Sequence, residues 1–461
     1  MKQIIYKFTR VLIALLLVMG LMACGESKEN EIEQQASENQ PVELEPYTPL
    51  EESEVIEYEA KAMKPKVMTD LLGYEPGSDK VVICVGDIER QSFEVINNET
   101  GESVFFGMLE AGAVDEKSGE ATYIGYFTGL TLEGKYHVRT DHLGESAPFE
   151  IRTGIESELF RESVLALGSL WNSDTVITCS DLPQLIAPVQ NVLIALEYYT
   201  ELLTDDLQIE ESGNDIPDAL DIVGRITDKV TELDTRECSA EELSAYVGIV
   251  SASAQGYKSF DKKKSEAYQA HAVSAYRELE RRAHQEDEAE GARFYAASLL
   301  ARVTGSSQYA RVAEDYLKEN AANMELGDYD YYGKVAYISS KYDVDRSLCS
   351  RVVAGMSEQV EKLCYISGRT AFMISNENVE EQYENITRIA IMNYMITNHE
   401  YVKLQGQHVH YMLGCNPDCV SYFDGYGDWK SDPLMTSSPK GVTSMILALC
   451  EVISEQAGTG L

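Results

Sequence analysis

Two hydrophobic periodicities divide the chain into regions of different secondary structure. Between about residues 61 and 154, short apolar runs such as "KVVICVG", "SFEVIN" and "ATYIGYFTGL" alternate with turn-forming stretches such as "NNETGE". From about residue 155 onward, apolar residues recur at intervals of three and four, as in "PVQNVLIALEYYTELL". The first pattern is typical of β-strands and the second of amphipathic helices, so we predict a β module followed by a helical region.

The β module, residues 61–154, has the strand spacing of a sandwich, and its size is that of an immunoglobulin-like domain. In the helical region, residues 155–461, consecutive helices with short links indicate antiparallel hairpins, which could close into an α/α barrel or stack as a solenoid. The absence of a fixed repeat length disfavours the solenoid. Helices are expected to begin near residues 157, 188, 216, 240, 263, 286, 307, 343, 382, 398 and 440, with one or two shorter candidates between them.

The first 24 residues have the pattern of a targeting segment. Basic residues precede a short apolar run that ends in "LMAC", and this run is too short for a comfortable transmembrane helix. The ending resembles a bacterial lipobox, which implies lipid attachment at Cys24; an ordinary signal peptide that happens to end near a cysteine is the alternative. Residues 25–60 are rich in Glu, Gln, Ser and Pro, so we expect a disordered acidic linker.

The charge of the chain limits its partners. It carries 77 acidic and 38 basic residues, a net charge of −39, which excludes nucleic acid as an expected partner because the phosphates would be repelled. Adhesion to an anionic lipid surface through protein charge is disfavoured for the same reason. Any membrane attachment would therefore depend on the lipid at Cys24, and we expect an extracytoplasmic protein anchored to the bacterial cell membrane.

The cysteines do not form a recognisable metal or redox motif. Eight of the nine follow Cys24, and none forms a CxxC pair. Cys415 and Cys419 are four residues apart, but no nearby Cys or His pair completes a strong zinc pattern; a site formed by His408, His410 and Cys415 is the less favoured alternative. We expect buried free thiols or one disulfide, and neither a metal nor another cofactor.

Two strings carry a resemblance to a known family. "ESGNDIPDALDIV", residues 211–223, reads as a loop entering a helix, with Asp215 as a capping residue and Pro217 in the first turn. This string and "YMLGCNPDCVSYFDGYG", residues 411–427, resemble signatures of cellulase-type enzymes of glycoside hydrolase family 9. The β module resembles the immunoglobulin-like domain that precedes the catalytic domain in one branch of that family. The resemblance covers about residues 62–461 and implies a β-sandwich followed by an all-α six-hairpin α/α barrel.

Family 9 enzymes invert the cut bond, which requires a carboxylate base and a carboxylic acid on opposite faces of the sugar. The resemblance places Asp181, in "TCSDLPQ", on the position of the base. Thr178 stands where the family has a second, water-holding Asp. An equally weighted interpretation is that Asp181 is a helix N-cap before Leu182 and Pro183. We expect Asp181 to lie near the mouth of the barrel and to be at least partly exposed.

The family's catalytic acid has no counterpart, because no Glu lies between Gly427 and Cys450. Asp428 and Asp432 are the only carboxylates in that segment, and solvated loop aspartates are the simpler interpretation of both. The loops that wall the sugar cleft in the family are also short here, and functional contacts concentrate on such loops. Loss of a general acid removes a rate factor of roughly 10²–10⁴.

Three hypotheses follow. The chain could be a surface lipoprotein with lost or much reduced catalysis that binds a β-glycan, cellulose-like or xyloglucan-like, or a protein partner. It could instead be an active inverting hydrolase with Asp181 as base and a non-standard acid, or a helical scaffold that binds no sugar. Stacking faces for sugar rings could come from aromatic residues whose alternative role is core packing: Trp171, Tyr422, Tyr426 and Trp429.

Overall fold

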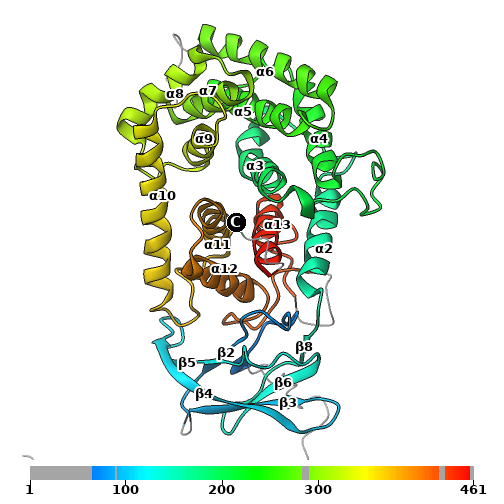
Figure 1. Cartoon of the computed structure of the whole chain (residues 1–461), viewed down its shortest axis with the longest axis vertical. Helices are drawn as coiled ribbons and strands as arrows, with labels where there is room; N and C mark the ends of the chain where they lie inside the picture. Colours follow the sequence, from blue (N-terminus) through cyan, green and yellow to red (C-terminus); the bar gives the residue numbers. More distant parts are fainter. Residues whose placement is uncertain (1–64, 89–90, 283–289, 425–430, 457–461) are drawn as a thin grey trace, which may run out of the picture. The chain divides into compact units, whose positions relative to one another are not determined.

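A computed structural model describes residues 65–88, 91–282, 290–424 and 431–456 of the 461-residue chain (Figure 1). Residues 63–461 group into one compact unit. Four of the candidate residues lie outside the described ranges, so their predicted roles stay untested: Cys24, Tyr426, Asp428 and Trp429.

The first described region is a two-layered antiparallel β structure. Its strands follow the order β1-β2-β5-β4-β3-β6-β7, and β8 pairs with β6. The long strand β4 joins the two layers, because its first half pairs with β3 and its second half with β5. The strands are β1 (Val67–Met68), β2 (Val81–Val85), β3 (Ser92–Asn97), β4 (Ser103–Val114), β5 (Ala121–Tyr126), β6 (Gly134–Thr140), β7 (Gly144–Glu145) and β8 (Phe149–Ile151).

Strand β2 connects the core of this β-sandwich to the core of the helical region. Its sequence, "VVICV", is apolar at every position, and all five residues are buried. Val82 and Cys84 point into the sandwich, whereas Val81, Ile83 and Val85 belong to the core shared with the helices. A continuous apolar run is the expected pattern for a strand covered on both faces. The sandwich is therefore packed onto the helical region through one of its own strands.

Helices occupy the chain from residue 155 onward. They are α2 (Ile155–Leu170), α3 (Leu182–Tyr198), α4 (Asp218–Thr231), α5 (Ala240–Tyr257), α6 (Lys262–Arg282), α7 (Glu290–Thr304), α8 (Ser307–Asn320), α9 (Asp328–Ile338), α10 (Arg346–Ser367), α11 (Val379–Met395), α12 (His399–Met412) and α13 (Pro439–Gln456), with short 3₁₀ turns η2 (Cys179–Asp181) and η3 (Thr200–Leu202).

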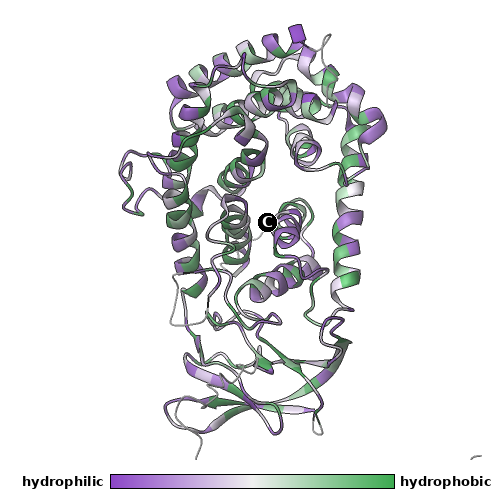
Figure 2. Ribbon diagram, turned by 180° about the vertical axis from the view of Figure 1, so that it is seen from behind, coloured by the Kyte–Doolittle hydropathy of each residue, from purple (hydrophilic) through white to green (hydrophobic). Residues whose placement is uncertain are grey.

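The odd-numbered helices form the inner ring of an α/α barrel. α3 packs against α5, α5 against α7, α7 against α9, α11 against α13, and α13 against α3. The inner helices α3 and α5 are buried over most of their surface, whereas the outer helix α8 buries only Ala313 and Leu317. In Figure 2 the outer helices α6 and α10 accordingly carry alternating hydrophilic and hydrophobic residues. The predicted fold class, an immunoglobulin-like β-sandwich followed by an α/α barrel, is confirmed.

Sequence periodicity missed one inner helix. The predicted helix starts do not include α9, "DYDYYGKVAYI", because this helix lacks an apolar stripe and is buried almost all round. Two of its buried residues, Asp330 and Lys334, form an ion pair at zero or near-zero exposure. Helices that are buried on every side do not show the one-sided pattern from which amphipathic helices are predicted.

The cysteines resolve into one disulfide and a set of thiols. Cys179, in η2, is bonded to Cys238, which lies directly before the N-cap residue of α5. The other six cysteines of the described ranges lie outside this disulfide, and four of these are buried. No helix in the described part of the chain is both long enough and apolar enough to cross a membrane.

Candidate active site at the barrel mouth

The inner helices begin at one end of the barrel, because the outer helices α4, α6, α8, α10 and α12 each return the chain to that end before the next inner helix starts. We call this end the mouth. It is where the two carboxylates of an inverting hydrolase would have to meet, and it includes the first turns of α3, α9, α11 and α13.

Asp181 lies at the start of α3 and is half-buried. Its carboxylate does not cap α3; instead Oδ2 accepts hydrogen bonds from the backbone N–H of Thr178 at 2.8 Å and from the Thr178 Oγ1 hydroxyl at 2.6 Å. The bonds run backward along the chain and close the 3₁₀ turn η2. The N-cap interpretation of Asp181 is therefore wrong for α3, and Pro183, which lacks an N–H, accounts for part of the reason.

The disulfide holds the loop that carries Asp181. Cys179 lies between Thr178 and Asp181, and its bond to Cys238 ties η2 to the start of α5. The loop is therefore held in two ways: the disulfide links it covalently to the start of α5, and hydrogen bonds between Thr178 and Asp181 fix its own turn.

Replacement of Asp181 by Asn should change the free energy of unfolding by less than about 1 kcal/mol, because an Asn oxygen can accept the same two bonds from Thr178. Urea denaturation of the two proteins measures the difference. A loss of several kcal/mol would identify Asp181 as a buried structural carboxylate and remove it from the candidate site.

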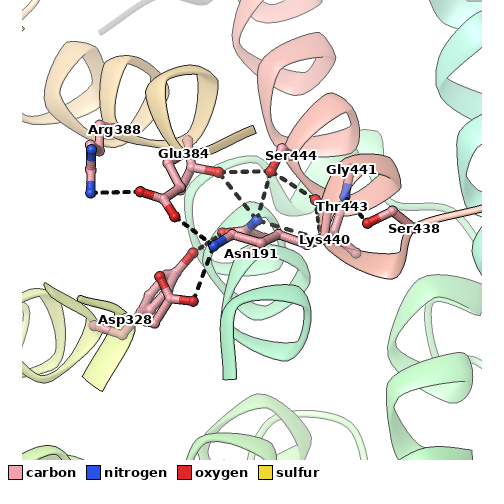
Figure 3. A network of polar contacts seen from close by, with 11 residues as sticks. Asn191, Asp328, Glu384, Arg388, Ser438, Lys440, Gly441, Thr443 and Ser444 are labelled. Atoms are coloured by element: carbon pink, nitrogen blue, oxygen red, sulfur yellow. Dashed lines mark hydrogen bonds and ion pairs between the residues drawn. The ribbon is translucent and has the colours of Figure 1, made fainter. Parts of the chain in front are cut away.

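The side chain of Lys440 lies between two carboxylates at the mouth. The ammonium of Lys440, in the first turn of α13, lies 2.9 Å from Glu384 of α11 and 3.2 Å from Asp328 of α9 (Figure 3). Arg388 forms a second ion pair with Glu384, at 3.0 Å. The side chains of this set are between 19% and 36% exposed. Two carboxylates thus face the mouth, and each is paired with a cation.

These pairs decide the protonation of the carboxylates. Burial disfavours the charge on Glu384, but Lys440 and Arg388 outweigh it and hold its pKa below the ordinary value. Burial likewise works against the Lys440 ammonium, and the charges of Asp328 and Glu384 raise its pKa nonetheless. A general acid needs a carboxyl group that keeps its proton near neutral pH, which requires a raised pKa. Glu384 has the opposite shift.

A buried polar network closes the barrel axis beneath Lys440. Asn191 of α3 has no exposed surface; its Nδ2 donates to Thr387, Thr443 and Ser444 at 3.2–3.4 Å, and its Oδ1 accepts from Tyr332 at 2.7 Å (Figure 3). Four inner helices meet at this side chain. Asn191 is ten residues after Asp181, about 15 Å further along the helix.

Asp432, the one acid candidate within the described residues, forms a local turn. It is half-buried in the turn before α13, and its Oδ1 accepts from the backbone N–H of Leu434 at 3.2 Å. This Asx-type turn is an ordinary local role for an aspartate.

Two of the proposed sugar-stacking residues are core residues. Trp171 is 2% exposed and Tyr422 is 6% exposed, and both pack within the helical core. Both rings therefore have the alternative role, core packing, rather than the surface position that stacking on a sugar ring requires. Trp171 ends α2, where its carbonyl accepts from Arg225 at 3.0 Å.

The polar residues of "ESGNDIPDALDIV" hydrogen-bond to the loop itself. Glu211 pairs with both ends of the Arg225 guanidinium, at 2.6 and 2.9 Å. The buried Asp218 carboxylate accepts from the Leu207 N–H and the Ser212 hydroxyl, both at 2.7 Å. These bonds fix the loop against α4, which is a structural role.

Within the same loop, Asp221 accepts from Asn214 at 3.0 Å, and burial raises its pKa to about 6. Asp215 does not cap α4, contrary to the expectation. It has a positive φ of 67° and its N–H donates to Asp205, while α4 begins at Asp218 after Pro217.

The string "YMLGCNPD" contacts the β-sandwich. Leu71 N–H donates to the Leu413 carbonyl at 2.8 Å, and a Cβ at Gly414 would lie only 2.6–2.8 Å from atoms of Leu71 and Thr69. Asn416, fully buried, donates to and accepts from the backbone of its own turn. Glycine at position 414 is therefore required for the two regions to pack this closely.

His408 and His410 do not converge. His408 is buried on α12 and its Nδ1 contacts the Leu404 carbonyl, whereas His410 pairs with Asp70 at 2.8 Å. The described residues include no group of three potential metal ligands.

The comparisons with known proteins agree with this architecture. Residues 62–145 match the cellulase N-terminal ig-like domain, and residues 221–434 match glycosyl hydrolase family 9. A cellodextrinase of Butyrivibrio fibrisolvens is 31% identical over 97 residues, which are 21% of this chain and 17% of that protein. The chain thus matches less than a fifth of that curated relative's length.

Solved structures share the fold at low identity. A metagenome-derived glycoside hydrolase family 9 endoglucanase superposes with a TM-score of 0.72 at 14% identity, covering 84% of this chain and 99% of that one. A thermostable endoglucanase mutant from Alicyclobacillus acidocaldarius gives 0.70 at 15% identity, with 84% and 99% covered. Bacteroides ovatus GH9 gives 0.69 at 15%, with 85% and 99% covered.

The fold and the site together define the class of protein: a β-sandwich is joined to an α/α barrel, and the mouth of the barrel carries charged side chains. Residues 62–145 thus carry a cellulase N-terminal ig-like domain and residues 221–434 a region of glycosyl hydrolase family 9.

Proposed function

We propose that this protein binds a β-glycan outside the cytoplasm without cleaving it, and that a lipid on Cys24 anchors it to the cell membrane. The observation that carries the first part is the ion-paired mouth: its carboxylates are balanced by Lys440 and Arg388 where hydrolysis needs a protonated acid.

Binding is supported by the family and by the chemistry of the mouth. The matched relatives are named as endoglucanases and a cellodextrinase, so a glucan chain is the ligand class to expect. Asp328, Glu384 and Lys440 are partly exposed, and their donors and acceptors of both signs suit the hydroxyl groups of a neutral sugar. Asp181, half-buried on the same end of the barrel, adds a further acceptor.

The anchoring part of the proposal depends on the sequence. The "LMAC" ending and the acidic stretch of residues 25–60 support a lipid-attached protein held at a distance from the membrane. Metabolic labelling with a fatty acid tests it: wild-type protein should be labelled, and Cys24→Ser should lose the label.

The functional proposal predicts binding with no change in chain length. Purified protein incubated with soluble mixed-linkage β-glucan or xyloglucan should retard the polysaccharide in affinity electrophoresis while its length distribution stays unchanged. Lys440→Met and Asp328→Asn should weaken retardation if the chain lies over the mouth. Failure to bind any β-glycan would contradict the proposal and favour a scaffold for a protein partner.

A further inference from the structure

The junction between the β-sandwich and the barrel contains a second polar groove. Strand β2 packs tightly on the helical core, whereas Tyr126 at the end of the neighbouring strand β5 remains 38% exposed. Two cavities of about 520 and 260 Å³ open between this sheet face and helices α10, α12 and α13. They adjoin, since both are lined by Tyr126, Lys403 and Gln407. We call the two together the junction groove.

The side chains of the groove have hydrogen-bonding groups that the protein leaves unused. Within the described ranges, the one hydrogen bond that the Gln407 amide donates goes to the thioether of Met373, at 3.8 Å, and a thioether is a weak acceptor. Lys403 is half-buried and forms no ion pair among the described residues; its ammonium lies 5.2 Å from the centroid of the Tyr126 ring. Glu110 and Glu400, at the rim, likewise have no ion-pair partner in the described part of the chain.

The charges of the larger cavity cancel. Glu110 and Glu400 are balanced by Arg369 and Lys403, so the wall offers donors and acceptors of both signs without favouring an ion. Tyr126 provides an aromatic face at the floor and bonds through its hydroxyl to the Met373 sulfur at 3.6 Å. An aromatic face surrounded by polar groups of both signs is suited to a neutral polyhydroxylated ring, whose C–H face is apolar and whose edge is polar.

We infer that the junction groove is a glycan-binding site, separate from the barrel mouth, in which a sugar ring of a neutral β-glucan oligosaccharide packs on Tyr126 and hydrogen-bonds to Gln407 and Lys403. This inference rests on the proposed function, that the protein binds β-glycan, and adds a location that the mouth does not provide. Both cavities fall within or close to the size range of small-molecule sites.

The groove includes a native reporter. Cys364 of α10 lines the larger cavity and is partly exposed, and Cys349 lies on the same helix with similar exposure but outside the groove. Burial raises the pKa of both thiols. Maleimide labelling of the full-length protein, with each site quantified by peptide mass spectrometry, compares the two cysteines under identical conditions.

Cellohexaose at ten times its dissociation constant should slow labelling of Cys364 about tenfold and leave Cys349 unchanged, because only the unoccupied fraction reacts. Tyr126→Ala should weaken cellohexaose binding by about tenfold or more in titration calorimetry, whereas Tyr126→Phe, which keeps the ring, should stay within about twofold. Tyr342→Ala, which removes a comparably exposed ring from the loop before α10, is the control and should bind like the wild type.

The outcomes separate the two proposals. Protection of Cys364 together with weakening by Tyr126→Ala supports the groove. Binding that survives Tyr126→Ala, leaves Cys364 unprotected and is lost in Lys440→Met places the glycan at the mouth; it overturns the groove and leaves the proposed function standing. A wild-type protein that binds no β-glucan oligosaccharide overturns both.

Discussion

Glu451→Gln should stabilise the protein at pH 8 and remove one fall in its stability between pH 6.5 and 8. Glu451, on α13, is 2% exposed; its Oε1 accepts from Asn393 at 2.6 Å, and its Oε2 is buried without a hydrogen-bond partner. Burial raises its pKa to about 8, although the Asn393 bond opposes this.

The direction in which stability changes with pH follows from the number of protons that the folded and unfolded states bind. Between pH 4.5 and 8 the folded protein holds a proton on Glu451 that the unfolded chain has released, so stability falls as pH rises through this window. Across the whole window, the free energy of unfolding falls by at most about 5 kcal/mol through Glu451. Glutamine keeps the acceptor for Asn393 and has no charge to bury, so it removes the loss.

Chemical denaturation of wild type and Glu451→Gln at several pH values measures this directly. His408, whose pKa burial lowers to about 4, contributes below pH 6.5 and cancels in the difference between the two proteins. Equal slopes for both proteins above pH 6.5 would show that Glu451 is ionised in the folded state and that its site is hydrated.

Asn191→Ala should destabilise the protein by about 2–4 kcal/mol. The substitution removes the hydrogen bonds that join α3, α9, α11 and α13, leaves the buried Tyr332 hydroxyl without its acceptor, and opens a cavity. Tyr332→Phe removes only one of these bonds and is the matched control, with an expected loss below about 1.5 kcal/mol.

Urea denaturation of the two variants compares them on one scale. A loss below 1 kcal/mol for Asn191→Ala would mean that the axis beneath Lys440 is not closed by this network. The mouth would then be deeper than the structure indicates.

Particular residues show which features of the fold could be predicted from sequence. Strands and most helices have one-sided or alternating patterns, so their order and the two-region architecture were accessible. Helix α9 was not, because burial on every side leaves no stripe to detect. The apolar run of β2 was recognised as a strand, but that its second face covers the barrel core depends on the partner region.

The candidate site was accessible only in part. Asp181 could be placed by resemblance, but its bonds to Thr178 depend on a local turn that propensity does not specify. Lys440, Glu384 and Asp328 are far apart in sequence, and each alone reads as an ordinary charged residue near a helix start. The signal that could have brought these three residues together is that each lies on an inner helix of the barrel rather than on an outer one. For Trp171 the sequence leaves sugar stacking and core packing open, because composition does not distinguish a ring in the core from one on a binding surface; its 2% exposure favours the core.

The Cys179–Cys238 bond illustrates the same limit. Pairing of two cysteines 59 residues apart follows from the adjacency of the first turns of α3 and α5, which only the closed barrel establishes. The two strings that carry the family resemblance are explained by structure: one anchors the loop before α4, and the other packs against Leu71 of the sandwich.

If the mouth lacks a working acid, two substrates with different leaving groups should respond differently to the protein, and they provide the most direct test. Hydrolysis of β-glucan needs protonation of the leaving oxygen, whereas a dinitrophenyl β-cellobioside does not, so loss of the acid affects only the first. Reducing ends released from β-glucan by the wild-type protein should not exceed those released by Asp181→Asn. Release from β-glucan that Asp181→Asn abolishes would contradict the account, because it would require a functioning acid opposite Asp181.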